Sequence, residues 1–227
     1  CGGTMRVVGV DVGLVHLAIV VLSGDVEGAI ALEEMRLVNI TRFTHGRVSE
    51  YDCVLPHTNH IADRLAHFWQ EHGDLFDEAD LVAVEQQPPM GLVAVEAFLM
   101  AKCRAVCEIV SPRALHGWVF GARHGKDYEQ RKVEMEMHAA ALCTRLSGDP
   151  TRWDRATRDL PRRHDVADAL AIAWYAFARR RALLLHGGEA PTPRFHAGAR
   201  VSPHFGGWPA GAKGERMWSR VLDDFPQ

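Results

Sequence analysis

Four carboxylates stand at positions where an acidic side chain is unusual. Asp11 ends the first apolar segment of the chain, and Glu85 ends the short apolar run LVAVE. Asp165 and Asp168 lie three residues apart at the start of an Ala-rich segment, so a helix would put them on one face. If the four groups converge they repel one another, and hard divalent cations such as Mg²⁺, which prefer oxygen ligands, relieve that repulsion. Two such ions about 4 Å apart stabilise the attacking and leaving oxygens in phosphodiester hydrolysis.

Each carboxylate also has an ordinary structural interpretation. Asp11 suits a turn or a helix cap, and Glu85 before Gln-Gln-Pro-Pro suits the exit of a strand. Asp165 and Asp168 suit the first turn of a helix, where the helix dipole favours acidic groups. The order of the features (a strand Asp followed by Gly13, a buried strand ending in Glu, and a late Asp-x-x-Asp helix) favours a shared site over three coincidences.

The elements that must position these groups alternate between strand and helix patterns, which predicts an α/β fold. We expect three antiparallel strands at the start of the chain. The expected strands cover 6–11, 14–22, 36–43, 81–85 and 107–110. The expected helices cover 57–73, 91–104, 128–146 and 165–185, with a short helix that begins at Ser111. The segments 121–127 and 147–163 are expected to be loops, the first basic and Gly-containing, the second Arg-rich.

Composition bounds the class of protein. The chain has 227 residues, of which 47% are hydrophobic and 24% charged, so it is long enough for one domain with a core and is not wholly disordered. We expect this domain over 5–186 and a Gly/Pro-rich tail over 187–227. No apolar run reaches the roughly 18 residues that span a bilayer, so no membrane partner and no signal peptide are predicted. Five cysteines without a Cys-x-x-Cys pair predict reduced thiols in a reducing, intracellular compartment.

Charge is divided unevenly along the chain. Residues 1–100 carry 5 Lys and Arg against 15 Asp and Glu, whereas residues 101–227 carry 21 against 14. This asymmetry indicates a polyanionic partner. The alternative is that the charges are distributed by chance and have no functional meaning. Lys126, Arg131 and Lys132 flank the basic loop before a helix and are the candidates for phosphate contacts to DNA. The alternative interpretation is that these three residues belong to a solvated helix face.

Three ordered segments resemble a known family. VVGVDVG at 7–13, LVAVE at 81–85 and HDVADAL at 164–170 look like the Holliday junction resolvases of the RuvC branch, within the ribonuclease H-like superfamily. The resemblance covers about residues 5 to 186 and is closest in look to poxvirus resolvases, with fungal mitochondrial resolvases next. It implies an α/β fold with a ribonuclease H-like mixed sheet, in which three antiparallel strands are followed by parallel strands and helices flank the sheet. The tail has no counterpart in it.

The resemblance also implies an activity: a homodimer that binds a four-way DNA junction and nicks two opposed strands symmetrically. Asp11, Glu85, Asp165 and Asp168 match the family's metal-binding acidic positions, which implies two Mg²⁺ ions per site, with Mn²⁺ as a substitute. His164 lies beside the last pair, offset from the position at which some RuvC-type enzymes have a His, so no role is assigned to it. A viral origin would imply the host cytoplasm, and a mitochondrial or cellular origin stays open.

Two other functions fit the same residues. One is a ribonuclease H-like nuclease that acts on RNA–DNA hybrid or structured RNA, and the other is a non-catalytic nucleic-acid-binding relative. The complete set of four carboxylates argues against the second. The basic loop and a candidate dimer helix argue for junctions over hybrids. The candidate dimer helix is the one expected over 91–104. Its apolar stripe would form the dimer face, and ordinary core packing is the alternative (Leu92, Val95, Phe98 and Leu99).

Overall fold

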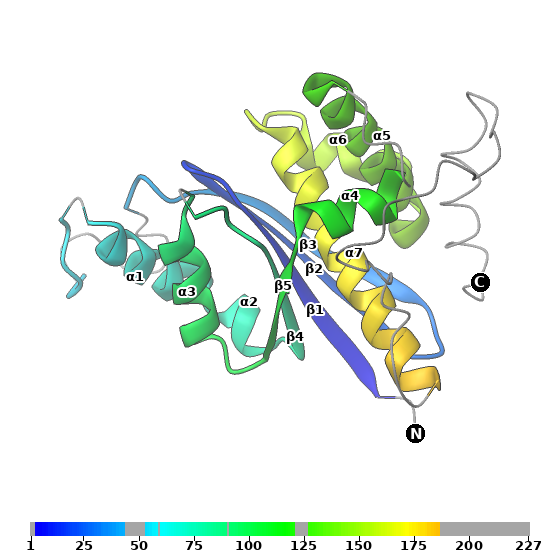
Figure 1. Ribbon diagram of the computed structural model, residues 1–227, viewed down its shortest axis with the longest axis horizontal. Helices are drawn as coiled ribbons and strands as arrows, with labels where there is room; N and C mark the ends of the chain where they lie inside the picture. Colours follow the sequence, from blue (N-terminus) through cyan, green and yellow to red (C-terminus); the bar gives the residue numbers. More distant parts are fainter. Residues whose placement is uncertain (1–2, 44–52, 59, 90, 121–126, 187–227) are drawn as a thin grey trace, which may run out of the picture.

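A single mixed sheet forms the centre of the molecule. The computed structural model describes residues 3–43, 53–58, 60–89, 91–120 and 127–186. Its five strands lie in the order β3-β2-β1-β4-β5: β1 (Thr4–Val12), β2 (His16–Asp25), β3 (Ile30–Asn39), β4 (Leu81–Glu85) and β5 (Val106–Val110). The first three strands pair antiparallel, and β4 and β5 run parallel to β1. The predicted mixed sheet is confirmed (Figure 1).

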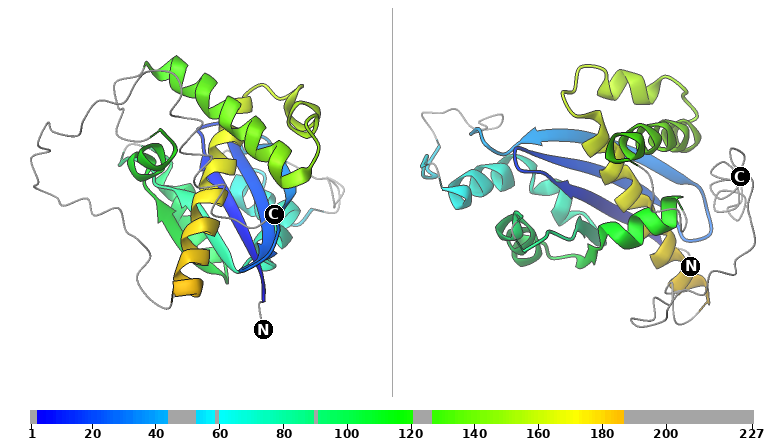
Figure 2. Two further views of the ribbon diagram at one scale, coloured as in Figure 1. Left: turned by 90° about the vertical axis from the view of Figure 1, so that its right-hand side faces the viewer. Right: turned by 45° about the horizontal axis from the view of Figure 1, so that its top comes forward.

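Helices cover both faces of this sheet. On one face lie α1 (Ile61–His72), α2 (Asp74–Asp77) and α3 (Val93–Lys102). On the other lie α4 (Pro112–Phe120), α5 (Tyr128–Ser147), α6 (Arg152–Thr157) and the long α7 (Arg163–His186). The views in Figures 1 and 2 agree on this division. No helix within the described ranges is both long and apolar enough to cross a membrane.

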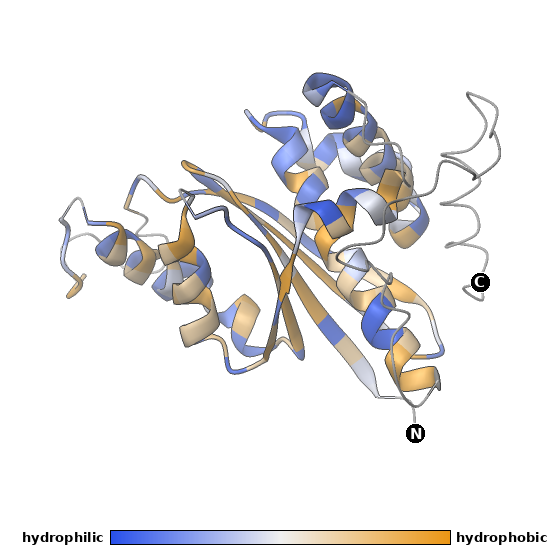
Figure 3. Cartoon of the chain, viewed as in Figure 1, coloured by the Kyte–Doolittle hydropathy of each residue, from blue (hydrophilic) through white to orange (hydrophobic). Residues whose placement is uncertain are grey.

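Each face of the sheet has its own hydrophobic core. Val7 of β1 packs into the cluster that includes α7, whereas Val8 and Val10 pack into the cluster beneath α1, α2 and α3. Because strand side chains alternate between the two faces, Asp11 shares the α7 face with Val7. The same alternation puts Glu85 on the α7 face of β4, since Ala83 packs there. Apolar residues dominate the strands in Figure 3, which makes a carboxylate on this surface exceptional.

Close contact between β1 and α7 sets the position of the helix. A Cβ added at Gly9 would lie 2.5 Å from the carbonyl oxygen of Ala169 and 2.5 Å from the backbone nitrogen of Ala173. Only a residue without a side chain fits there, and the two alanines let the helix backbone approach the strand. Asp165 lies one turn before Ala169 on the same face of α7. The first turn of the helix therefore lies over the end of β1.

Two sequence expectations were wrong in their bounds. β3 covers Ile30–Asn39 and not 36–43, because residues from Ile30 onward pair with β2. The strand ends where the Asn39 side chain accepts hydrogen bonds from the backbone and hydroxyl of Thr41. The Arg-rich segment 147–163 is not wholly a loop: it contains α6, whose Trp153 is buried, and the first residue of α7. One buried aromatic among polar residues is too weak a periodicity to predict a helix.

Other expectations hold with smaller shifts. The helices expected over 57–73 and 91–104 are shorter, as α1 and α3, and α2 was not predicted. In the predicted stripe on α3, Val95 and Leu99 are fully buried in the core, as the core alternative expects, and Leu92 and Phe98 are partly buried against it. Three aromatic residues border the basic segment 121–127. Two of them, Trp118 and Phe120, pack against the α7-side core, whereas the third, Tyr128, is 55% exposed. Lys126 and the tail at 187–227 lie outside the described residues.

Candidate active site

Asp11 and Glu85 lie side by side at the end of the sheet. The parallel ladder between β1 and β4 pairs Val10 with Val84, so the next residue on each strand is one of these carboxylates. Asp11 is buried, with 8% of its surface exposed. Burial, followed by the negative charges of Asp168 and Glu85 and a side-chain hydrogen bond with Glu85, raises its pKa well above the usual range. Burial also raises the pKa of Glu85.

The first turn of α7 brings the other two carboxylates to the same place. Burial, followed by the negative charges of Glu85 and Asp165, raises the pKa of Asp168 to about 8. Asp165 also contributes to the raised pKa of both Asp11 and Glu85. All four predicted carboxylates therefore lie within electrostatic range of one another on the α7 face, at the ends of β1 and β4 and in the first turn of α7.

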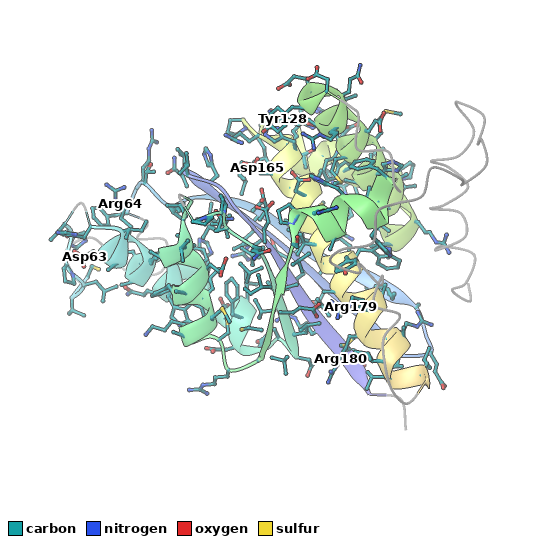
Figure 4. All side chains as sticks on the ribbon, viewed as in Figure 1. Asp63, Arg64, Tyr128, Asp165, Arg179 and Arg180 are labelled. Atoms are coloured by element: carbon teal, nitrogen blue, oxygen red, sulfur yellow. The ribbon has the colours of Figure 1, made fainter. Side chains whose placement is uncertain are left out.

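Asp165 has one oxygen that an ion pair, without good hydrogen-bond geometry, holds in a buried position. The Nε atom of Arg162 lies 2.7 Å from Asp165 Oδ2. The Oδ2 atom is nevertheless buried without a well-directed hydrogen bond. The other oxygen, Oδ1, lies 3.1 Å from Nε2 of His164. A Cβ added at Gly13, just after β1, would lie 3.8 Å from Oδ2, so this oxygen faces the end of the strand (Figure 4 labels Asp165).

The donor set fits a hard divalent cation. Burial and mutual repulsion raise the pKa values of Asp11, Glu85 and Asp168, and the Asp165 carboxylate lies beside them, so a positive charge among these groups would be favourable. Mg²⁺ takes one or two carboxylates and keeps several waters, so it needs no closed cage of protein ligands. Among the described residues, no three carboxylates each offer an oxygen within 4.8 Å of the other two, which is the spacing of a compact metal site. The set therefore matches hydrated ions better than a single, fully protein-ligated one.

Basic groups from α5 and from the start of α7 border the carboxylates. The ammonium of Lys132 opposes the raised pKa of Asp168 and, after burial, contributes to the lowered pKa of His164. Lys132 therefore lies within electrostatic range of the cluster. It also lies 4.1 Å from the ring centroid of Tyr128, and Arg131 lies 5.8 Å from the same centroid. Of the predicted pair on α5, Lys132 therefore lies near the carboxylates, whereas the contact of Arg131 is with the Tyr128 ring.

Sequence reasoning missed two polar neighbours of the site. Arg162 pairs with Asp165, and Glu136 of α5 adds to the raised pKa of Asp168. Glu136 lies four residues after Lys132, one helical turn along the same face, which is the signal that could have found it. Arg162 belongs to the Arg-Arg-His run directly before Asp165, and that run was treated as part of a loop.

Comparison with known proteins supports the fold. The solved structure of the Fowlpox virus resolvase with its substrate Holliday junction DNA matches with a TM-score of 0.53 and 12% identity, over 76% of this chain and 97% of that chain. The yeast mitochondrial Holliday junction resolvase matches with a TM-score of 0.53 and 17% identity, over 80% of this chain and 82% of that chain. No protein-family profile and no curated protein sequence matches the chain. The chain therefore has the ribonuclease H-like fold, which it shares with these two resolvases.

Proposed function

We propose that this protein is a Mg²⁺-dependent endonuclease that resolves four-way DNA junctions by paired symmetric nicks. The observation that carries the proposal is the meeting of Asp11, Glu85, Asp165 and Asp168 on one face of the sheet, next to the ammonium of Lys132. Acidic groups serve the metal ions, and basic groups beside them serve the phosphates of a nucleic acid. Both solved relatives are named as Holliday junction resolvases, which supports the choice of substrate.

The proposed roles follow from the position of each group. Asp11, Glu85, Asp165 and Asp168 would hold two Mg²⁺ ions, which supply Lewis-acid activation of the scissile phosphate and of a water. The buried strand ends of Asp11 and Glu85 fix two of these carboxylates rigidly, because β1 and β4 are packed on both faces. Lys132 and Arg131 would orient the DNA backbone over the site. Arg162, which now pairs with Asp165, is placed to exchange that partner for a phosphate oxygen.

The homodimer is part of the proposal because two symmetric nicks need two active sites. We expect sedimentation velocity of the full chain to show a dimer at micromolar concentration, with or without junction DNA. A strictly monomeric protein under both conditions would contradict paired nicking. That result would favour a nuclease that acts on one strand at a time, such as one specific for RNA–DNA hybrid.

Substrate choice is tested by incubating the protein with an immobile four-way junction, a linear duplex and an RNA–DNA hybrid of matched sequence, with Mg²⁺ or with EDTA. We expect cleavage of the junction only, and only with Mg²⁺. Asp168→Asn should abolish cleavage. Asp25→Asn is the matched control, since Asp25 pairs with Thr4 at the opposite end of the sheet. Preferential cleavage of the hybrid would replace the junction proposal with the hybrid nuclease, and equal binding without any cleavage would indicate a non-catalytic relative.

A further inference from the structure

A second cluster of metal-binding side chains lies on the other face of the sheet, away from the carboxylates. It consists of Cys53 and His57, in the segment that precedes α1, and His67, in the middle of α1. One ligand atom from each of the three side chains lies within 4.8 Å of the other two. Asp63 and Arg64, labelled in Figure 4, mark the part of α1 that carries the cluster. The cysteine count alone had predicted only reduced thiols here, because the pattern contains no Cys-x-x-Cys pair.

The tautomer of His67 is fixed by its surroundings. Its ring is buried, with 1% of the residue exposed, and Nε2 lies 3.2 Å from the carbonyl oxygen of Pro56. Because a carbonyl oxygen only accepts hydrogen bonds, Nε2 carries the proton and Nδ1 carries the lone pair of the neutral ring. That lone pair faces Cys53, whose Sγ lies 3.7 Å from Nδ1. A histidine that donates its other N–H to a backbone carbonyl has the second-shell arrangement typical of a metal ligand.

The spacing of the two buried donors suits a tetrahedral ion. Zinc binds cysteine sulfur at about 2.3 Å and histidine nitrogen at about 2.0–2.1 Å, so two such ligands of a tetrahedral ion lie roughly 3.6 Å apart. The 3.7 Å between Cys53 Sγ and His67 Nδ1 agrees with this separation. The ring of His57 lies 4.6 Å from that of His67, centroid to centroid, which brings a third donor to the same point.

Phe43 holds the two imidazoles in place from the β3 side. Its ring meets His57 and His67 edge to face, with centroid distances of 5.1 and 4.8 Å. An apolar ring against both ligands restricts their rotation and keeps water from one side of the cluster. His57 itself is exposed, so an ion can enter from solvent.

We propose that Cys53, His57 and His67 bind one Zn²⁺ ion that holds the segment 53–58 against α1. One thiolate and two imidazoles are a donor set that zinc prefers over Mg²⁺ and Ca²⁺, and a water completes the tetrahedron. Binding releases the thiol proton of Cys53 to solvent. β3 runs in the same direction as β1, because both are antiparallel to β2, so β3 ends at the same edge of the sheet as Asp11. The ion is independent of the carboxylate site, and the proposal does not depend on nuclease activity.

Cobalt substitution tests the proposal on the purified full chain. We expect Co²⁺ to produce a sulfur-to-cobalt charge-transfer band and tetrahedral d–d bands, both of which added Zn²⁺ abolishes at one equivalent. Cys53→Ser should remove the charge-transfer band. Cys107→Ser should keep it, because Cys107 lies near Cys103 and not near the cluster. Loss of the band in Cys107→Ser, with retention in Cys53→Ser, would overturn the proposal by assigning the metal to the other cysteines.

His57→Ala gives a test that does not depend on the buried residues. Since His57 is exposed, this variant should keep the fold, as measured by circular dichroism. Its zinc affinity, measured by chelator competition, should fall at least as far as the roughly 10–100-fold that loss of a second-shell partner costs. Native mass spectrometry of the wild-type chain should show one retained zinc. A wild-type chain that binds no zinc and gives no cobalt band would show instead that Cys53 and His67 share only an S–H···N hydrogen bond.

Discussion

Removal of the carboxyl group of Asp168 is expected to stabilise the protein in the absence of metal. Its pKa rises from an ordinary value near 3.8 to about 8 on folding, so the folded chain binds a proton that the unfolded chain has released. A raised carboxyl pKa contributes stability that is present at low pH and is lost as the pH rises from 3.8 towards 8. Asp168→Asn removes this titration and one of the charges that act on Asp11.

The size of the effect follows from the pKa difference. Each pH unit inside this window changes the free energy of unfolding by about 1.4 kcal/mol per group. Between pH 5 and pH 7 the wild-type chain therefore loses up to about 3 kcal/mol through Asp168. In a domain of this size, about 1 kcal/mol moves Tm by roughly 2–4 °C. The wild-type Tm in EDTA should fall by about 6–12 °C relative to that of Asp168→Asn over the same interval.

The assay is thermal unfolding followed by circular dichroism in EDTA at both pH values, for the wild type, Asp168→Asn and the control Asp25→Asn. Millimolar Mg²⁺ should raise the Tm of the wild type at pH 7, because the ion neutralises the cluster, and should raise that of Asp168→Asn less. If Asp168→Asn lowers Tm equally at both pH values and Mg²⁺ shifts neither protein, the carboxylates do not form a strained metal site.

Three further predictions rest on other parts of the structure. Asp11→Asn and Glu85→Gln should each reduce junction cleavage to background while junction affinity, measured by gel shift, stays within a few-fold; wild-type rates would remove that residue from the site. Lys132→Ala should lower the slope of log K against log salt by about one, whereas Lys102→Ala, at the far end of α3, should leave it unchanged; equal slopes would make Lys132 a solvated residue. Gly9→Val should destabilise the fold by several kcal/mol in urea unfolding, since its Cβ would meet Ala169 backbone at 2.5 Å; a cost below about 1 kcal/mol would contradict the close packing.

The sequence predicted the elements that carry the candidate site, because these strands and helices have strong patterns. Leu81–Glu85 is apolar up to its last residue, and its bounds were predicted correctly. The Asp165 and Asp168 pair begins an Ala-rich helix whose position was predicted to within two residues. Alternation along β1 then decides which face Asp11 occupies. These features depend on local periodicity, which a single sequence carries.

The parts that could not be predicted depend on contacts between distant segments. The position of Lys132 beside Asp168 depends on how α5 packs against α7, which no local pattern encodes. Cys53 and His67 are separated by fourteen residues and meet only because the segment before α1 folds back along that helix. The start of β3 was missed because Glu33 and Glu34 interrupt its apolar pattern, although pairing with β2 stabilises it.

The most direct test of the proposed function maps the cuts in an immobile four-way junction whose four strands are labelled in turn at the 5′ end. With Mg²⁺, the wild-type chain should nick two opposed strands at symmetry-related positions and leave ligatable ends, and Asp11→Asn should nick neither. Cleavage confined to one strand, cleavage that persists in Asp11→Asn, or an intact junction under conditions in which an RNA–DNA hybrid is cut would contradict the assignment of a junction-resolving site to these carboxylates.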